Sequence, residues 1–272
     1  MKIIKYLLIV VLFIGVGAGA WLYYPQYQIH KMKKQTVEVS KDNTTVSYLD
    51  YFRDSNASQI NHLALGDSII RGVGAGENEN LVSQFSSRLE QQIHKPIVFQ
   101  NEGINGITSG ELVALVQDGR FDEEIKKANI VTINVGGNDV LRMAKGQNFQ
   151  NVFQSFSQLQ TSFSKNLSGI ADRIHMLNPD ATIVFLELYN PLSPDNDMYS
   201  LADKLLPKWN LQIYQVAGHY SSSMVVETTQ AINGEKLQNL SPDGVHPNSA
   251  GYTAISELMI DQFKHQYRKE PV

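Results

Sequence analysis

The chain has 272 residues, a hydrophobic content of 42% and a formal net charge of −4 at pH 7. This composition is typical of a globular protein, and the weak negative charge provides none of the basic surface that nucleic-acid binding requires. The chain contains no cysteine, which excludes disulfides, thiolate metal sites and a cysteine nucleophile. We therefore expect a globular protein with no nucleic-acid partner.

The first 24 residues have the pattern of an export segment. Lys2 and Lys5 precede an uncharged stretch of 19 residues, from Tyr6 to Tyr24. At about 1.5 Å per residue, a helix of this stretch reaches roughly 28 Å, close to the thickness of the bilayer hydrocarbon. Small residues at positions 18–20 also fit the cleavage pattern of a signal peptide, which is the alternative interpretation. We predict an exported protein, either anchored in the cell membrane and facing outward or secreted if the segment is cleaved.

The rest of the chain divides into a polar segment and one long domain. Residues 25–60 have no sustained apolar face, and we interpret them as a stalk in which a short strand or helix packs on the domain. Residues 61–268 alternate between short apolar runs and amphipathic stretches. The predicted strands lie at residues 63–65, 96–103, 128–137, 181–190 and 223–232, and the predicted helices at residues 79–94, 109–119, 149–177, 198–220 and 248–267.

Apolar strands that alternate with helices predict a parallel sheet covered on both faces. The expected fold class is α/β: a three-layer α/β/α sandwich with a central parallel sheet of about five strands, as in flavodoxin-like proteins. A TIM barrel needs roughly eight such units and is disfavoured. In open parallel sheets, ligands bind beyond the carboxyl ends of the strands. Polar motifs that directly follow a strand are therefore the candidates for a functional site.

A serine directly follows the first predicted strand, in the motif Gly-Asp-Ser that ends at Ser68. Alone, this motif is also typical of a serine that caps a helix. A serine attacks a carbonyl only if a base takes its proton and an acid orients that base. Asp243 and His246 lie in a turn before the last predicted helix and can supply these two roles, although an ordinary surface turn is the alternative. The other histidines lack a nearby acid in such a loop, and we interpret them as surface or packing residues: His30, His62, His94, His175, His219 and His265.

Two further strand ends offer donors for the oxyanion that forms when a serine attacks an ester. Gly106 follows the second strand, and it has no side chain to obstruct a carbonyl that approaches its N–H. Asn138 follows the third strand in the motif Val-Gly-Gly-Asn-Asp, where its amide can point into the site. Each motif alone also fits an ordinary turn. Together with the Ser68 N–H, they predict an oxyanion hole at the carboxyl edge of the sheet.

The motifs together resemble the four blocks of the SGNH subgroup of the GDSL hydrolases, and they occur in the family order: LGDSIIRG, NEGINGITS, VGGND and DGVHPN. The resemblance covers approximately residues 61–266, with Ile69 in place of the leucine of the family name. It implies the three-layer sandwich and ester hydrolysis by a triad of Ser68, His246 and Asp243. A metal site built from Asp67, Asp243 and His246 is a disfavoured alternative, and we expect neither metal nor cofactor.

The same resemblance bears on the substrate. The forms GDSIIRGVGAG and DGVHPNSAGY are most similar to the lysophospholipase- and thioesterase-like branch, which favours lipid or simple acyl esters. We expect the loop Leu188–Ser200 to border the acyl pocket of a monomeric catalytic domain. The alternatives are a carbohydrate O-acetylesterase acting on cell-wall glycan and a non-catalytic surface module that binds glycan. The sequence contains no Gly-x-Ser-x-Gly motif and no phosphate-binding glycine loop, so an α/β-hydrolase elbow and nucleotide binding are disfavoured.

Overall fold

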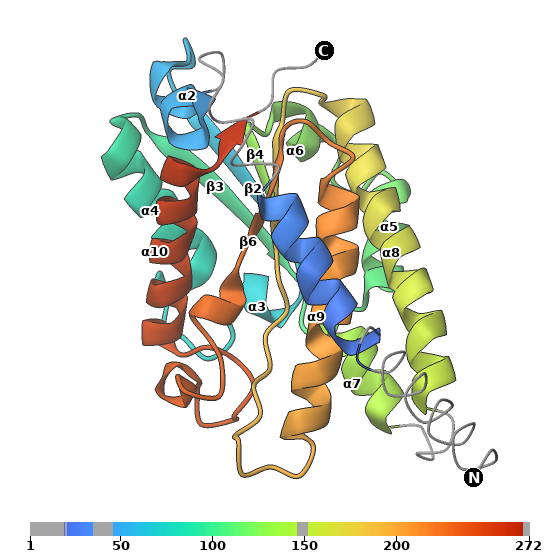
Figure 1. Ribbon diagram of the computed structural model, residues 1–272. Helices are drawn as coiled ribbons and strands as arrows, with labels where there is room; N and C mark the ends of the chain where they lie inside the picture. The colour runs from blue at the N-terminus through green and yellow to red at the C-terminus, as the bar shows by residue number, and fades with distance from the viewer. Residues whose placement is uncertain (1–18, 20, 35–45, 146–151, 269–272) are drawn as a thin grey trace, which may run out of the picture.

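The centre of the protein is a five-stranded sheet. The computed structural model describes residues 19, 21–34, 46–145 and 152–268. The strand order is β3–β2–β4–β5–β6, and every neighbouring pair is parallel. Helices cover both faces, which confirms the predicted three-layer α/β/α sandwich (Figure 1). The strands are β2 (Ile60–Gly66), β3 (Ile97–Gly103), β4 (Ile130–Asn134), β5 (Thr182–Leu186) and β6 (Ser223–Val226).

The register of the sheet decides which strand ends meet. Strands β4 and β5 are buried over their whole length because helices cover both of their faces, and their sequences are accordingly apolar runs without alternation. Gly66, the last residue of β2, pairs with Gly103 of β3 on one side and with Asn134 of β4 on the other. The loops that follow β2, β3 and β4 therefore begin at the same edge of the sheet.

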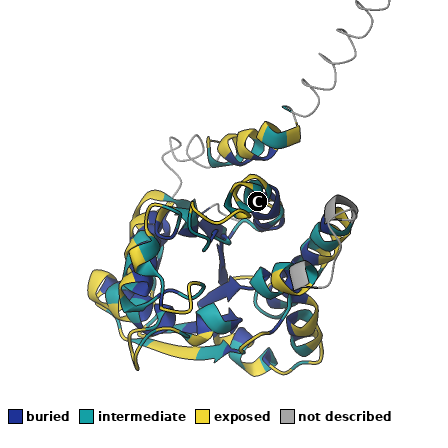
Figure 2. Cartoon of the chain, turned by 90° about the horizontal axis from the view of Figure 1, so that it is seen from below, coloured by how far each residue is buried: buried dark blue, intermediate teal, exposed yellow. Residues whose placement is uncertain are grey.

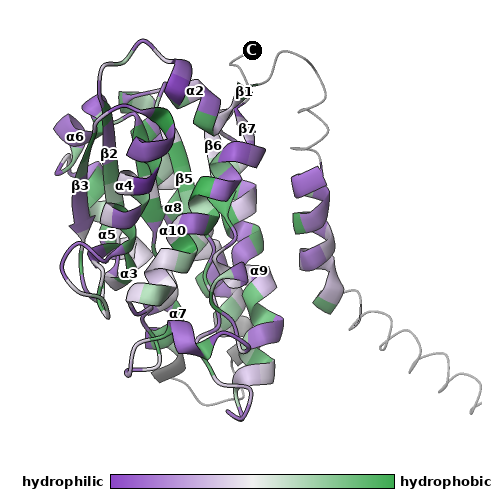
Figure 3. Ribbon diagram, turned by 90° about the vertical axis from the view of Figure 1, so that its left-hand side faces the viewer, coloured by the Kyte–Doolittle hydropathy of each residue, from purple (hydrophilic) through white to green (hydrophobic). Residues whose placement is uncertain are grey.

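The helices form two layers. One face of the sheet packs against α2, α4 and α10, and the opposite face packs against α5, α6, α8 and α9 (Figures 1 and 3). The short helices α3 and α7 directly follow β2 and β4. The bounds of the helices are α2 (Tyr48–Asp54), α3 (Ser68–Arg71), α4 (Leu81–Ile93), α5 (Ser109–Gln117), α6 (Asp122–Lys127), α7 (Gly137–Lys145), α8 (Val152–Leu177), α9 (Tyr199–Ala217) and α10 (Ser249–His265), with 3-10 turns η2 (Thr228–Gln230) and η3 (Leu237–Asn239).

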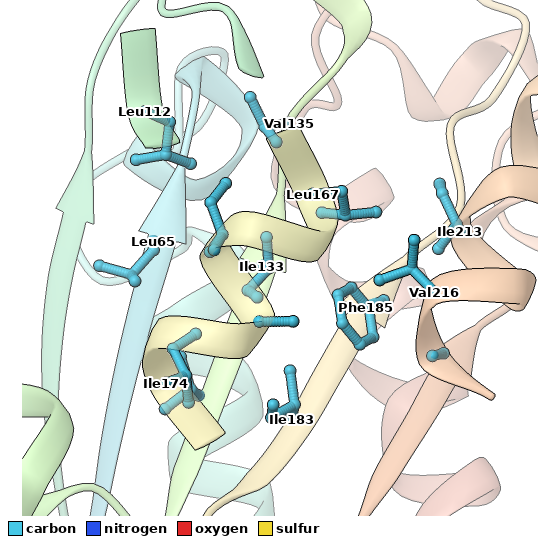
Figure 4. Close-up of a cluster of buried hydrophobic side chains, with 14 of the residues drawn as sticks. Leu65, Leu112, Ile133, Val135, Leu167, Ile174, Ile183, Phe185, Ile213 and Val216 are labelled. Atoms are coloured by element: carbon cyan, nitrogen blue, oxygen red, sulfur yellow. The ribbon is translucent and has the colours of Figure 1, made fainter. Parts of the chain in front are cut away.

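The larger hydrophobic core lies between the sheet and the helices α5, α8 and α9. Figure 4 shows Leu65, Ile133 and Phe185 of the sheet facing Leu167 of α8 and Val216 of α9. Burial of each such side chain contributes about 1.5–3 kcal/mol to folding. Figure 2 shows the same distribution from below, with buried residues on the sheet and on the inward faces of the helices. The sheet is therefore a rigid platform for the loops at its carboxyl edge.

Part of the predicted stalk packs into the domain. Tyr48 and Phe52 of α2 are fully buried, and the ring of Phe52 stacks on Phe263 of α10. Strand β1 (Val46–Ser47) pairs with β7 (Tyr267–Arg268), which joins this segment to the end of the chain. The core thus extends into the segment 25–60. A short strand or helix packed on the domain is expected in this segment, but its position is not, because a helix of only seven residues offers too few positions for a clear periodicity.

A further helix, residues 21–34, precedes β1 and α2 in the chain, lies mostly within the predicted stalk and is drawn in blue in Figure 1. Its Ile29 joins the larger core, and Met32 packs against it. Most of the predicted membrane anchor or signal peptide, residues 1–24, lies outside the described residues. Among the residues that are described, no helix is both long and apolar enough to cross a membrane.

Candidate active site

Ser68 occupies the tip of the turn between β2 and α3. The Asp67 N–H donates to the carbonyl of Asn134 at 3.0 Å, and this bond holds the turn against the end of β4. The Asp67 carboxylate accepts from the Ile69 N–H at 2.9 Å and caps α3. Ser68 is therefore the first residue of a short helix, so its N–H is free of intrahelical bonding. The turn presents both the hydroxyl and the N–H of Ser68 at the carboxyl edge of the sheet.

The loop before α10 brings His246 to this serine. The Ser68 Oγ lies 2.8 Å from His246 Nε2, and His246 Nδ1 lies 2.6 Å from an oxygen of Asp243. Because a carboxylate can only accept, Nδ1 carries the proton, and Nε2 is left to accept from the serine hydroxyl. The two loops approach closely at Gly74, where a Cβ atom would lie 2.4 Å from the carbonyl oxygen of Pro247. A glycine after the serine is thus needed for the histidine loop to fit.

The Asp243 carboxylate is held in its ionised form. Its second oxygen accepts from the backbone N–H groups of Val245 and His246 at 2.9 and 3.0 Å, and from the Ser241 hydroxyl at 2.8 Å. Partial desolvation raises the pKa of this carboxyl, but the hydrogen bonds from the His246 ring, the backbone and Ser241 outweigh it and keep the pKa well below its usual range. A carboxylate that is charged at every physiological pH can stabilise a protonated imidazole beside it.

The two predicted oxyanion donors lie on adjacent loops that are bonded together. Gly106 has a φ of +76°, a left-handed conformation that favours glycine, and open space surrounds the position of its missing Cβ atom. The Asn138 amide donates to the carbonyl of Ile107 at 3.0 Å, which leaves its second N–H available. The sequence predicts that these residues follow the second and third strands of the chain; in the sheet β2 lies between those two strands, and the loops after them meet through the Asn138–Ile107 bond.

A buried network behind these donors was not found from the sequence. The Asp139 carboxylate accepts from the Ser109 N–H at 2.9 Å and from the Ser109 hydroxyl at 2.6 Å. The Asn166 amide of α8 donates to the same hydroxyl at 2.9 Å. The network ties the start of α7 to α5 and α8 directly beside Asn138. Only the position of Asp139 next to Asn138 could have suggested it, because its partners are distant in the chain.

A second, exposed link runs from α7 to the Gly106 loop. Arg142 donates to the carbonyl of Gly106 at 2.9 Å and forms an ion pair with Glu111 at the same distance. Hydrogen bonds from Arg142 and from the cap residue Thr108 lower the pKa of Glu111 to about 2. The Gly106 loop is therefore fixed at its carbonyl by Arg142 and at the adjoining residue by Asn138.

Asp67 lies between the two halves of the site. Burial raises the pKa of its carboxyl to about 7, opposed by the Ile69 N–H and by nearby His246 and increased by Asp139. The carboxyl is almost fully inaccessible, so it serves the turn and not the substrate.

His62 is not part of the candidate site. His62 is buried between the hydroxyls of Ser86 and Thr132, and burial lowers the pKa of its ring to about 3, so it is a packing residue. Within the described part of the chain, no three histidine, aspartate or glutamate side chains gather as a metal site.

A chain of hydrogen bonds from carboxylate to imidazole to serine hydroxyl, at the carboxyl edge of a parallel sheet, is the arrangement of a serine hydrolase. Comparison with known proteins places this chain in one such family. Residues 64–254 match the GDSL-like lipase/acylhydrolase family, and the protein belongs to it.

Individual relatives are moderately similar. The spore germination lipase LipC of Bacillus licheniformis is 29% identical over 74% of this chain and 94% of its own. Among solved structures, the lipase Lip_vut3 from a goat rumen metagenome has a TM-score of 0.67 and 28% identity over 75% of this chain and 97% of its own. A variant of Axe2, an acetyl xylan esterase of Geobacillus stearothermophilus, has a TM-score of 0.58 at 21% identity over 76% and 95% of the two chains, which shows a shared fold. Enzymes of this family are hydrolases, so a non-catalytic glycan-binding module is not supported.

Proposed function

We propose that the protein is a serine esterase that hydrolyses lipid or simple acyl esters. Ser68 attacks the ester carbonyl, and His246 takes the hydroxyl proton through Nε2. His246 then returns this proton to the leaving alcohol, while Asp243 stabilises the imidazolium. Water, activated by the same histidine, attacks the acyl-serine and releases the acid. The observation that carries this proposal is the 2.8 Å contact between Ser68 Oγ and an imidazole whose other nitrogen contacts Asp243.

Three donors are available for the oxyanion. The Ser68 N–H lies at the start of α3, the Gly106 N–H is exposed by a left-handed turn, and Asn138 retains one amide N–H. Preorganised donors of this kind stabilise the charge that develops on the carbonyl oxygen, and each contributes about 10²–10³-fold in rate. This arrangement supports acyl transfer in preference to a reaction in which no oxyanion forms.

The substrate class is argued from the relatives. The two relatives that are 28–29% identical are both named as lipases, which favours a lipid or simple acyl ester. The alternative is a carbohydrate O-acetylesterase acting on cell-wall glycan. The named acetyl xylan esterase shares only 21% identity, which supports the fold and not the substrate.

We further propose that the domain acts outside the cytoplasmic membrane and is attached to it. The support is the uncharged run that follows Lys2 and Lys5 and extends to Tyr24. Cleavage after the small residues at 18–20 would release the domain instead. Membrane extraction of the intact protein, with the N-terminal sequence of the product, distinguishes these two outcomes.

The test of the reaction combines labelling with a substrate panel. A fluorophosphonate probe is expected to label the wild-type protein and to leave Ser68→Ala unlabelled, with an unchanged melting temperature for the variant. Hydrolysis is then measured on acyl esters from acetyl to long-chain, beside an acetylated glycan. Labelling of Ser68→Ala at the wild-type rate would overturn the nucleophile. Preference for the acetylated glycan would replace the lipid assignment by the alternative.

A further inference from the structure

We propose that the helix of residues 21–34 holds the domain so that the carboxyl edge of the sheet, with Ser68, faces the lipid bilayer. This rests on the membrane attachment proposed above and adds a fixed orientation to it. The partner that this edge contacts is the lipid bilayer.

The helix is fastened to α9 at its start and to the residue after β6 near its end. The Lys208 ammonium donates to the carbonyl of Trp21 at 2.7 Å and lies 3.1 Å from the centre of the Trp21 ring. At the other end, Lys33 forms an ion pair with Glu227 at 2.7 Å. Ile29 is buried between these two contacts. Contacts at both ends, with an apolar side chain between them, make the helix a fixed part of the domain and not a free linker.

The docked helix runs toward the active-site edge when it is followed back to Trp21. Its partner Lys208 is two residues before Asn210, whose amide donates at 2.9 Å to Leu188, just beyond the carboxyl end of β5. Trp21 therefore lies level with the carboxyl edge. Lys33 lies over the ring of Tyr214, six residues after Lys208 on α9, and its partner Glu227 directly follows the carboxyl end of β6. The helix therefore runs from the carboxyl ends of the strands to Trp21, which contacts a residue nearer the start of α9. Figures 1 and 3 both show the start of the helix toward the end of the molecule that carries α7.

The helix consequently begins, at Trp21, at the active-site edge, and the chain that precedes Trp21 in sequence joins it there. In sequence, this chain is uncharged back to Tyr6. The first turns of the docked helix expose several aromatic side chains, of which Tyr23 is 70% exposed. Tryptophan and tyrosine are enriched at the interface between bilayer and water, because one end of each ring is apolar and the other polar. The exposed aromatic residues of this segment are Trp21, Tyr23, Tyr24 and Tyr27.

The active-site edge also exposes apolar side chains. Leu141 of α7, after β4, is 45% exposed, and Met198, which precedes α9, is 40% exposed. Single exposed apolar residues are ordinary on a protein surface. These two gain significance because they lie at the edge from which the apolar segment departs. A domain held in this way meets esters at the membrane surface at a high effective concentration.

The absence of cysteine allows a direct test of the orientation. Leu141→Cys reports on the active-site edge and Tyr23→Cys on the start of the helix. Met176→Cys is the matched control, because exposed Met176 lies in the last turn of α8, just before β5 begins, and so at the opposite edge. Each variant of the full chain is labelled with a fluorophore and reconstituted in phosphatidylcholine vesicles that contain a nitroxide-labelled lipid. We expect loss of most of the fluorescence at positions 23 and 141, and none at position 176.

Equal quenching at positions 141 and 176 would overturn the orientation. Unquenched labels at all three positions would overturn the membrane attachment as well. The measurement needs no turnover, so it can be made on Ser68→Ala, and its failure is separate from failure of the esterase assignment. Circular dichroism of each labelled variant verifies the fold.

A second variant tests the docking contact. Lys208→Met removes the ammonium that holds Trp21, whereas Lys126→Met removes an exposed lysine of α6 that is distant from the helix in the fold. We expect Lys208→Met to reduce quenching at position 141 while position 23 remains quenched, with hydrolysis of a soluble ester unchanged. Lys126→Met is expected to change neither label. Unaltered quenching at position 141 in Lys208→Met would overturn the role of the docked helix.

Discussion

The two halves of the candidate active site are held in place by different kinds of contact. The loop of Asp243 and His246 is ordered by its own neighbours: Asp243 accepts from the N–H groups two and three residues later. The loops of Gly106 and Asn138 are ordered across the fold, by bonds between residues 31 and 36 positions apart. The Asp243–His246 pair therefore has a local geometry, although the Tyr189 hydroxyl also donates to the Val245 carbonyl of this loop at 2.8 Å. The oxyanion half depends on how α5, α7 and α8 pack.

This difference predicts how each half responds to substitution. A change in the histidine loop should remove a chemical group and leave the rest of the site intact. A change behind the oxyanion donors should move those donors without removing any of them, and it should also affect folding stability. The predictions below test this contrast, from the largest expected effect to the smallest.

The largest effect is expected for Asp243→Asn. An amide can donate to His246 Nδ1 and so favours the tautomer that cannot accept the serine proton. The expected loss in kcat is on the order of 10³–10⁴-fold, with little change in melting temperature. The measurement is hydrolysis of a soluble short-chain ester. A loss below about tenfold would show that Asp243 does not orient the base.

Asn138→Ala removes a donor from the other half. We expect kcat to fall by about 10²–10³-fold. Because Asn138 also donates to the Ile107 carbonyl, the melting temperature should fall as well, unlike that of Asp243→Asn. A variant that lost activity without any change in stability would contradict the view that this half depends on tertiary contacts.

The buried network behind Asn138 should act on activity indirectly. Ser109→Ala and Asp139→Asn each break the hydroxyl–carboxylate bond of 2.6 Å, and we expect each to lower kcat by roughly tenfold through displacement of Asn138, with KM nearly unchanged. The double variant should be no worse than the more damaging single variant, because one bond is lost in all three. Additive losses in kcat would show that the two residues do not act through a shared bond.

Asp67 interacts electrostatically with His246 of one half and Asp139 of the other, and its titration should make the folding stability depend on pH. Its pKa is raised to about 7, so the folded state binds the proton more tightly than the unfolded chain does. Its contribution to stability is therefore complete in acid and declines as the pH rises toward 7. Asp67→Asn should flatten this decline when the melting temperatures of variant and wild type are compared between pH 4 and 7. Parallel curves would show that Asp67 is ionised throughout this range.

The smallest effect is expected for Arg142→Ala. Its ion pair with Glu111 is largely exposed, and exposed pairs contribute about 0–1 kcal/mol. Because Asn138 still holds the neighbouring carbonyl, we expect kcat to fall by only a few-fold and the melting temperature to change little. Ser68-dependent hydrolysis measured at low and high salt provides the check, since salt screens such a pair. A loss as large as that of Asn138→Ala would show that the Gly106 loop depends on its exposed contact.

The sequence was sufficient to predict much of the fold. The continuous apolar runs of β4 and β5 indicated a buried parallel sheet, and the fold class is confirmed. It predicted that a short strand or helix of the stalk packs on the domain, but it did not locate α2 or its buried Tyr48 and Phe52. The reason is physical: a long buried strand has an apolar pattern of its own, whereas a seven-residue helix is stabilised by the partner that it covers.

The candidate site shows the same difference between what a local sequence pattern indicates and what packing decides. The sequence alone determined that Ser68, Gly106 and Asn138 each follow a strand, and that Asp243 can reach His246, because strand ends and short-range turns are local properties of the chain; that β2 lies between β3 and β4 was decided by the tertiary structure. Only the tertiary structure decided that Ser109 and Asn166 hold the position of Asp139, and that Lys208 holds Trp21. These contacts join segments that only packing brings together, and no short-range pattern in a sequence records them.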